Sequence, residues 1–253
     1  ALEALAKRVP ALVEEALERA DLDGPGGADI AHVLSRLNSS GAVALLKRGL
    51  HSGDPRTRRA VVQALAMANA TDVAQLIGYA VADEDIDVQI AAVLTLGQMS
   101  TVEANVALGY ALVSLFHPFR AEAVLALGRR EASDSIPRIR ALLEDREPVV
   151  IAAALDALAW LGDPEVAAAA ERALSHADDE VFQAGLRAAH TLPTRDAERL
   201  VGMGLKHSAW NVRMLAIKLL LALDTERTRA LLAEALAGES DPVVRRALET
   251  GEL

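Results

Sequence analysis

The feature that most constrains this chain is an internal repeat of about 31 residues. Its clearest copy runs from Glu147 to Asp178, where one apolar segment begins after Pro148 and a second begins after Pro164. One apolar column of the repeat holds Leu50, Val81, Leu112, Leu143, Leu174, Leu205 and Leu236. A column four residues earlier holds Leu46, Ile77, Leu108, Ile139, Ala170, Val201 and Leu232. Because a spacing of four puts both columns on one side of a helix, we predict a first helix in each unit, named helix A.

A second pair of apolar columns predicts another helix in each unit, named helix B. One column holds Leu34, Leu65, Leu96, Leu127, Leu158, Ala189 and Leu220, and the other holds Val62, Val93, Val124, Leu155, Leu186 and Ile217. Helix A is predicted near 40–51, 71–82, 102–115, 133–144, 164–175, 194–206 and 225–237. Helix B is predicted near 55–68, 86–98, 118–130, 148–161, 179–191, 210–222 and 242–249.

Each unit of two short helices is too small to bury its own apolar faces, so neighbouring units must share a core. The N-terminal pair, residues 1–38, is irregular: a helix over 2–19 precedes a loop rich in glycine and proline. With the regular repeats of residues 39–253, the sequence predicts one all-α solenoid domain over 1–253, with about eight antiparallel helix pairs. Asp29, Asp54, Asp163 and Asp241 are predicted to cap the starts of helices.

Composition and charge exclude several classes of protein. The net charge of −10 and the pI near 5.1 disfavour binding to nucleic acid. The absence of cysteine excludes disulfides and thiolate metal sites, and a cytoplasmic location is expected. No apolar run is long enough to span a membrane, and residues 1–20 have no signal-peptide core. Since the chain begins at Ala1 rather than methionine, a fragment of a longer protein or a trimmed chain is expected.

The repeat resembles HEAT repeats of the short type named after phycobilisome lyases. The stretch Asp241-Pro242-Val243-Val244-Arg245-Arg246-Ala247 is similar to the family pattern Asp-Pro-x-Val-Arg-x-Ala. Leu96-Gly97, Leu127-Gly128 and Leu161-Gly162 are similar to its Leu-Gly element, and the resemblance covers residues from about 28 to 249. It implies a right-handed superhelix in which helix B lines the concave face.

The resemblance also implies a structural ladder, in which aspartates and arginines of helix B pair between adjacent units. The ladder residues are Asp54, Arg58, Asp85, Arg120, Asp178, Arg213, Asp241 and Arg245. Phe116 and Ala209 interrupt the aspartate column, so those two turns are expected to be remodelled. We interpret these arginines as structural rather than functional.

Helix-B positions outside the core columns are predicted to contact a partner on the concave face. They are Arg59, Gln63, Ile90, Leu94, Glu122, Leu125, Asp156, Trp160, Gln183, Arg187, Trp210, Asn211, Met214 and Lys218. An apolar strip is expected in the middle of this face, formed by Ile90, Leu94, Ala121, Leu125, Ala152 and Ala153. Such a strip favours a groove for an amphipathic helix, unless the face is assigned one position off and the strip belongs to the core.

Three of these residues have competing interpretations. Trp160 and Trp210 are either interface anchors or rings that fill gaps between helices. Glu122 stands in a column of alanines, where it acts in acid–base chemistry, receives a partner's cation or is simply exposed at a helix start.

No motif for catalysis or cofactor binding accompanies the repeat. His176 and His207 occupy equivalent sites in adjacent units, too far apart to share a metal, and are expected to favour helix dipoles. The His-Glu pairs that resemble iron ligands in HEAT-type hydroxylases are missing. No metal, cofactor or catalytic residue is therefore predicted, and an enzyme is disfavoured.

Three functions remain open. The first is a non-catalytic scaffold or adaptor that binds a helix or extended segment of another protein on its concave face. The second, implied by the resemblance alone, is a bilin-lyase-like protein that handles a tetrapyrrole on an antenna protein. The third is a HEAT-like nucleic-acid-binding protein, which the net charge of −10 disfavours. The oligomeric state stays open.

Overall fold

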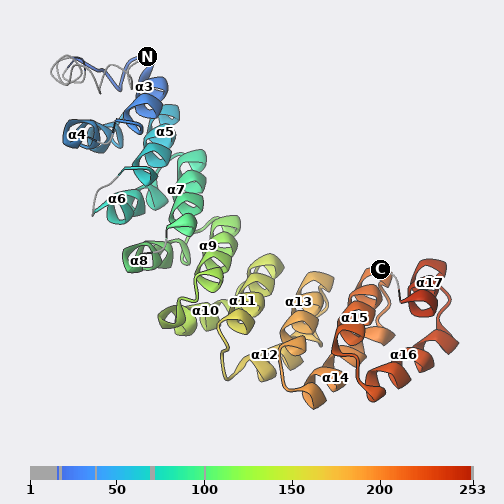
Figure 1. Cartoon of the computed structure of the whole chain (residues 1–253). Helices are drawn as coiled ribbons and strands as arrows, with labels where there is room; N and C mark the ends of the chain where they lie inside the picture. Colours follow the sequence, from blue (N-terminus) through green and yellow to red (C-terminus); the bar gives the residue numbers. More distant parts are fainter. Residues whose placement is uncertain (1–15, 17–18, 38, 69–71, 100, 252–253) are drawn as a thin grey trace. The chain divides into compact units, whose positions relative to one another are not determined.

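The computed structural model describes residues 16, 19–37, 39–68, 72–99 and 101–251 (Figure 1). Within this part of the chain every regular element is a helix, which confirms the predicted all-α class. The predicted N-terminal helix over 2–19 falls almost entirely outside the described residues. The chain divides into two compact units, residues 1–130 and residues 131–253.

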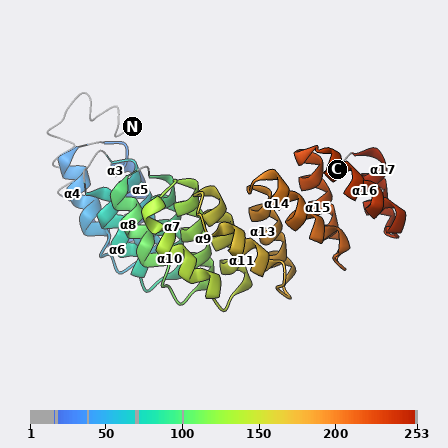
Figure 2. The ribbon, with the colours of Figure 1, turned by 90° about the horizontal axis from the view of Figure 1, so that it is seen from below.

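The described helices of the first unit alternate between helix A and helix B. They are α3 (Gly27–Leu34), α4 (Ser40–Gly49), α5 (Pro55–Ala66), α6 (Val73–Tyr79), the 3-10 turn η1 (Ala80–Ala82), α7 (Ile86–Gln98), α8 (Val102–Ala111) and α9 (His117–Arg129). The helices α4, α6 and α8 form one layer, here called the A layer. The helices α3, α5, α7 and α9 form the B layer, in which each helix packs on the next (Figures 1 and 2).

The second unit repeats the same alternation. Its helices are η2 (Ser133–Ser135), α10 (Ile136–Ala141), η3 (Leu142–Glu144), α11 (Pro148–Trp160), α12 (Val166–Ala173), α13 (Asp179–His190), α14 (Thr194–Met203), η4 (Gly204–Lys206), α15 (Trp210–Leu223), α16 (Glu226–Gly238) and α17 (Pro242–Thr250). Here α11, α13, α15 and α17 form the B layer, and α10, α12, α14 and α16 form the A layer.

The core lies between the two layers of each unit and follows the predicted columns. All members of both helix-B columns are buried, as is the helix-A column that starts at Leu46. The column that starts at Leu50 is buried only in part, since Leu50, Leu143, Leu205 and Leu236 are partly exposed. Helix B therefore has two buried stripes, because it contacts both neighbours in its own layer and the helices of the A layer.

Two predicted helix caps are wrong. Asp29 does not cap a helix, because α3 begins at Gly27 after Gly26, which puts Asp29 inside the first turn. Asp163 does not cap α12, which begins three residues later at Val166. Asp54 and Asp241 do cap α5 and α17, and their carboxylates accept N–H groups of the first turn.

The Leu-Gly element after α11 has a clear conformational cause. Gly162 lies in the left-handed region at φ 64°, which glycine adopts without a steric penalty. Its N–H donates to the carbonyl of Ala159 at 3.2 Å, and the N–H of Asp163 donates to the carbonyl of Leu158 at 3.0 Å. These two bonds form a Schellman motif that ends α11 and turns the chain toward α12.

Candidate functional site

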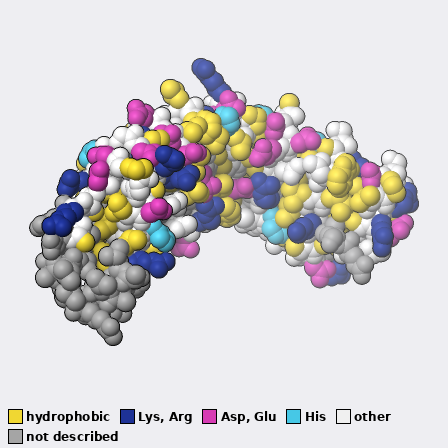
Figure 3. Space-filling model, turned by 90° about the horizontal axis from the view of Figure 1, so that it is seen from above, with side chains coloured by type: hydrophobic (Ala, Val, Ile, Leu, Met, Phe, Trp, Pro, Cys, Tyr) yellow, Lys and Arg dark blue, Asp and Glu magenta, His cyan; other side chains and the backbone are white. Residues whose placement is uncertain are grey.

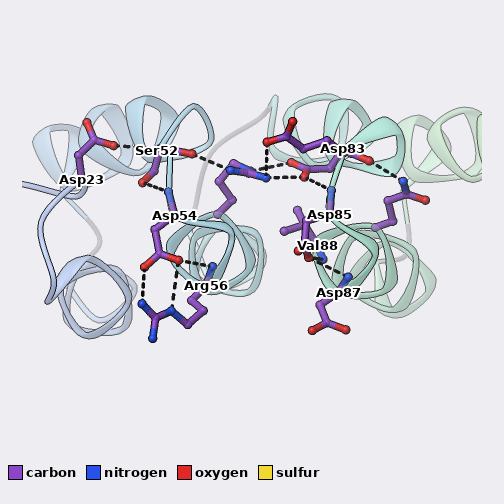
Figure 4. Close-up of polar contacts among 12 residues, drawn as sticks. Asp23, Ser52, Asp54, Arg56, Asp83, Asp85, Asp87 and Val88 are labelled. Carbon is purple, nitrogen blue, oxygen red and sulfur yellow. Dashed lines mark hydrogen bonds and ion pairs between the residues drawn. The ribbon is translucent and has the colours of Figure 1, made fainter.

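The predicted ladder joins successive helix pairs, but its arginines bind other acidic residues than the expected aspartates. The guanidinium of Arg58 donates to both carboxylate oxygens of Asp83, at 2.9 and 2.8 Å, and to the carbonyl of Ser52 at 2.8 Å. Asp85, the expected partner, instead caps α7 (Figure 4). An N-cap carboxylate satisfies orphan N–H groups of its own helix, so the arginine pairs with the acid two residues before the cap.

The same arrangement recurs near the C-terminal end of the second unit. Arg213 donates to both oxygens of Glu239, at 2.8 and 3.0 Å, and to the carbonyl of His207 at 2.9 Å. Asp241 caps α17, and its own N–H donates to Glu239 at 2.8 Å. The acid two residues before the cap thus binds both the arginine and the start of the next helix B.

Electrostatics fit this structural role. Burial works against ionisation of Asp83, but the hydrogen bonds from Arg58 and from the backbone N–H of Asp85 outweigh it and hold the pKa of Asp83 below its ordinary value. The hydrogen bonds from Arg213 likewise lower the pKa of Glu239 against the effect of burial. Both carboxylates are therefore ionised at neutral pH.

The remaining ladder residues also serve the backbone. Arg120 donates to the carbonyl of Ser114 at 2.8 Å, and Arg245 donates to the carbonyl of Glu239 at 2.6 Å. The aspartates Asp54 and Asp178 cap α5 and α13. The expected remodelling at Phe116 and Ala209 is not seen. The helices α9 and α15 begin directly after these residues and lack only a side-chain cap.

The residues predicted to contact a partner all lie on B-layer helices, with side chains that are exposed or half-buried. In the first unit they are Arg59, Gln63, Ile90, Leu94, Glu122 and Leu125. In the second unit they are Asp156, Trp160, Gln183, Arg187, Trp210, Asn211, Met214 and Lys218. Hydrophobic side chains reach the surface at several places on the face drawn in Figure 3.

Half of the predicted apolar strip is wrong. Ala121, Ala152 and Ala153 are buried, and Ala152 packs in a cluster with Leu155 and Val181. Ala152 thus packs against α13 and does not line a groove, and Ala121 and Ala153 are likewise buried. Within the first unit, Ile90 and Leu94 do reach solvent, at 38% and 47% exposure.

Several of the polar candidates are held in ion pairs. Arg187 on α13 donates to both oxygens of Asp156 on α11, at 2.9 and 2.7 Å. Glu122 accepts from Arg129 at 2.8 Å on the same helix, so a neighbouring cation already balances its charge. The rings of Trp160 and Trp210 are half-exposed, at opposite ends of their helices α11 and α15.

Each of the two equivalent histidines makes a hydrogen bond that the sequence analysis does not predict. His176 Nδ1 accepts the N–H of Asp178 at 3.0 Å, and His207 Nδ1 accepts the N–H of Ala209 at 3.2 Å. They thus occupy the position taken by Asp83 in the first unit. Within the described residues, no three side chains of His, Asp or Glu are arranged to hold a metal ion. No helix in the described part of the chain is long and apolar enough to cross a membrane.

An exposed apolar surface that the sequence interpretation missed lies on the A layer of the first unit. A groove of about 940 Å³ runs along α6, η1 and α8 and reaches the loop before α9. Its most prominent residues are Tyr79, Val106, Tyr110, Val113, Leu115 and Phe116. The two tyrosines are 69% and 66% exposed, so large apolar side chains stand in solvent along both sides. We call this surface the α6–α8 groove.

A sequence signal for this groove exists. Tyr79 and Tyr110 are the only tyrosines in the chain, and they occupy equivalent positions in adjacent repeats. The apolar columns used to predict the fold identify buried positions, so they do not include exposed residues such as Tyr79 and Tyr110. In the second unit the corresponding positions include Arg172 and Met203.

Comparisons with known proteins bear on the fold. A family model described as HEAT repeats matches residues 44–108, 106–190 and 170–251. No curated protein matches the sequence. The crystal structure of YibA from Escherichia coli superposes with a TM-score of 0.58 at 16% identity, over 87% of this chain and 83% of that chain.

Two further structures are similar. A chain in a homology model of the AP-3 complex in an intermediate open conformation superposes with a TM-score of 0.61 at 15% identity, over 86% of this chain and 46% of that chain. The CpcE–CpcF complex of phycocyanin lyase from Nostoc sp. PCC7120 gives a TM-score of 0.44 at 20% identity, over 86% of this chain and 87% of that chain. Such low identities bear on the fold alone. Since the family matches together run from residue 44 to residue 251 over helix pairs with a shared core, the chain belongs to the HEAT-repeat family.

Proposed function

We propose that this chain is a non-catalytic scaffold that binds a segment of another protein. The observation that carries the proposal is the α6–α8 groove, where Tyr79, Tyr110 and Val113 stand in solvent at 69%, 66% and 82% exposure. A contiguous apolar groove with polar residues at its margin is typical of a protein-interaction site. Tyrosine also provides a large contact area at a low entropic cost, which suits it as an anchor.

The A layer of the second unit shows that apolar exposure is not required by the repeat. There Arg172 pairs with Glu144 at 3.1 Å, and Arg199 pairs with Glu171 at 2.8 Å. These pairs lie between successive A-layer helices and keep that surface charged and solvated. Tyrosine and valine at the corresponding positions of the first unit therefore need an explanation beyond the stability of the fold.

The B-layer residues predicted from the sequence form a second proposed contact surface. In the first unit it is centred on Ile90 and Leu94, and in the second unit on Trp160 and Trp210, all exposed large side chains. Trp is a favoured interface anchor, which supports the proposal. The similarity in fold to a chain of the AP-3 complex is compatible with a role in an assembly. The predicted cytoplasmic location belongs to the same proposal.

The polar candidates argue against an enzyme. Glu122 is paired with Arg129, and Asp156 is paired with Arg187, so neither carboxylate is arranged as a general base. The carboxylates of Asp83, Asp163 and Glu239 pair with arginines of the preceding helix pair and so hold neighbouring helix pairs together.

Affinity capture with matched variants tests the proposal. Tyr110→Glu puts a charge in the groove, whereas Met203→Glu puts the same charge at an equivalent exposed position of the second unit. We expect the wild type and Met203→Glu to capture a common set of proteins that Tyr110→Glu does not capture. Circular dichroism should show the same helicity for all three proteins. Identical sets for all three proteins would contradict a role for the groove.

A further inference from the structure

We propose that His207 is a pH-sensitive switch at the start of α15. In its neutral form the imidazole accepts the backbone N–H of Ala209, and in its protonated form it releases this N–H and pairs with Asp179 on α13. The inference goes beyond the proposed binding function and does not depend on it. Two observations carry it: a column of hydrogen-bond acceptors that recurs in successive repeats, and the contacts of the imidazole with α13.

The residue that precedes each B-layer helix from α5 to α17 donates its backbone N–H to a side chain two residues earlier. These bonds measure 2.8–3.2 Å, and the accepting side chains are Ser52, Asp83, Ser114, Asp145, His176, His207 and Glu239. The serine, aspartate and glutamate members accept through an oxygen atom, which keeps its lone pairs near neutral pH. The two histidines accept through an imidazole nitrogen, whose lone pair is lost when the ring is protonated.

The hydrogen bond of His207 requires one particular form of the ring. Nδ1 accepts the N–H of Ala209 at 3.2 Å, so a neutral imidazole in this position carries its proton on Nε2. A second proton, taken from solvent, binds Nδ1 and turns it into a donor that faces another donor. The bond to Ala209 then breaks. Histidine is the residue type whose charge ordinarily changes between pH 5 and 8, so mild acid is sufficient to trigger this step.

Asp179 offers the protonated ring a second partner. Its Oδ1 lies 3.8 Å from Nε2 of His207, and the carboxylate is 48% exposed, so it is free to move toward the ring. A neutral imidazole gains little from this carboxylate, whereas an imidazolium forms an ion pair with it. The equivalent His176 is exposed and forms no ion pair within the described residues, so its protonation breaks a bond without a replacement.

The contact between α13 and the start of α15 lacks the permanent ion pair found at the next joint of the ladder. There Arg213 binds Glu239 through two hydrogen bonds. At the position of the arginine, α13 has Phe182, whose ring centroid lies 4.5 Å from that of His207. A phenyl ring packs against the imidazole but carries no charge that would fix its protonation state. The charge of His207 is therefore free to change with pH.

The other charged groups around His207 provide no comparable partner. Arg213 donates to the carbonyl of His207 at 2.9 Å, and Glu239 balances its charge. The remaining charged residues that line a groove with His207 are Glu198 and Arg199 on α14, Lys206 on η4, and Arg227 and Glu234 on α16. Within the described residues, Asp179 is the one carboxylate at ion-pair distance from the imidazole.

The switch acts next to an exposed tryptophan. Ala209 is the N-cap residue of α15 and supplies no side-chain cap, so the bond to His207 supports this helix start. Trp210 is the first residue of α15 and is 54% exposed. Release of the Ala209 N–H should therefore change the surroundings of the Trp210 ring, which belongs to the second proposed contact surface.

The fluorescence of Trp210 tests the inference in the full chain. Trp160→Phe removes the other tryptophan and serves as the background for all variants. We expect the emission to change reversibly between pH 8 and pH 5 along a one-proton curve, while far-UV circular dichroism stays constant. His207→Ser should abolish the change, because serine makes the same bond at Ser52 and Ser114 and does not titrate.

Three further measurements support the assignment. His207→Asn offers an amide oxygen and should abolish the change as well, so the test does not rest on one variant. His176→Ser is the matched control at the equivalent position and should leave the change intact. Asp179→Asn removes the partner of the imidazolium and should move the midpoint of the change to lower pH by about half a unit, as expected for an exposed ion pair.

Either of two fluorescence results would overturn the inference. One is the absence of any change in Trp210 emission between pH 8 and pH 5, and the other is a change that persists in both His207→Ser and His207→Asn. An unchanged midpoint in Asp179→Asn would refute the pairing with Asp179. Side-chain ¹⁵N NMR at pH 8 checks the starting state: we expect His207 to be protonated on Nε2 alone, and protonation on Nδ1 instead would also overturn the inference.

Discussion

We expect the ion pair between Arg58 and Asp83 to be a main connection between two successive helix pairs of the first unit. These pairs are α4 with α5 and α6 with α7. The side chains are only 7% and 12% exposed, and two hydrogen bonds join the guanidinium to the carboxylate. Asp83→Ala would leave Arg58 buried with the carbonyl of Ser52 and a distant contact to Glu84 at 3.4 Å. Removing one partner of a buried pair typically costs about 3–5 kcal/mol.

We expect Asp83→Ala to lower the free energy of unfolding by about 3 kcal/mol, the low end of that range, because Arg58 keeps one hydrogen bond. Urea unfolding followed by far-UV circular dichroism at pH 7 measures the change. Glu84→Ala is the matched control, since its carboxylate contacts the same arginine but is 87% exposed. Its unfolding midpoint should stay close to that of the wild type.

The same pair makes stability depend on pH. The pKa of Asp83 is lowered in the folded protein, since the hydrogen bonds from Arg58 and the Asp85 N–H outweigh burial. The stabilisation is thus fully present above the pKa of the unfolded chain, about 4, and is lost as pH falls through the lower folded pKa. The difference between wild type and Asp83→Ala should shrink below about pH 4. A difference no larger than that of Glu84→Ala, or one independent of pH, would refute the reasoning.

Three further predictions concern the second unit. Leu155→Ala should destabilise the protein by about 2–5 kcal/mol in urea unfolding, because the side chain is 1% exposed in the core between the layers. Gly162→Ala should cost about 1 kcal/mol by the same assay, because φ 64° strains any residue with a Cβ, while open space around Gly162 excludes a steric clash. Asp163→Asn should lower the melting temperature near pH 7 but much less at low pH, because hydrogen bonds from Arg140 lower the pKa of Asp163. Equal melting shifts at both pH values would contradict this assignment.

The fold could be predicted from the sequence because its determinants are local and repeated. Each helix carries its own apolar stripe, and the stripes recur in every unit, so columns such as the one from Leu65 to Leu220 identify the core. Helix starts were accurate where Asp stands at the cap, as at Asp54 and Asp241. The cap at Asp163 was wrong because Gly162 redirects the chain before the helix begins, which the Asp-Pro pair does not reveal.

The surface was harder to predict because its chemistry depends on distances between side chains of neighbouring helix pairs. The family resemblance places Asp85 in the ladder, yet Arg58 binds Asp83, two residues earlier, because the course of the loop decides which carboxylate reaches the arginine. Ala152 was placed in a groove although it faces a neighbouring helix, because side chains at the edge of a stripe are divided between core and surface. Tyr79 and Tyr110 lie outside the buried columns and differ from the residues at the same position in other repeats. A search for apolar columns shared by all repeats therefore does not identify them.

Site-specific photo-crosslinking in the native host tests the central claim most directly, that the α6–α8 groove contacts a partner protein. Tyr110→benzoylphenylalanine places a photoreactive ring in the groove, and Met203→benzoylphenylalanine places it at the equivalent position of the second unit. We predict a discrete higher-mass adduct with another protein from position 110 and none from position 203. The absence of an adduct at position 110, or the same adducts from both positions, would contradict the claim.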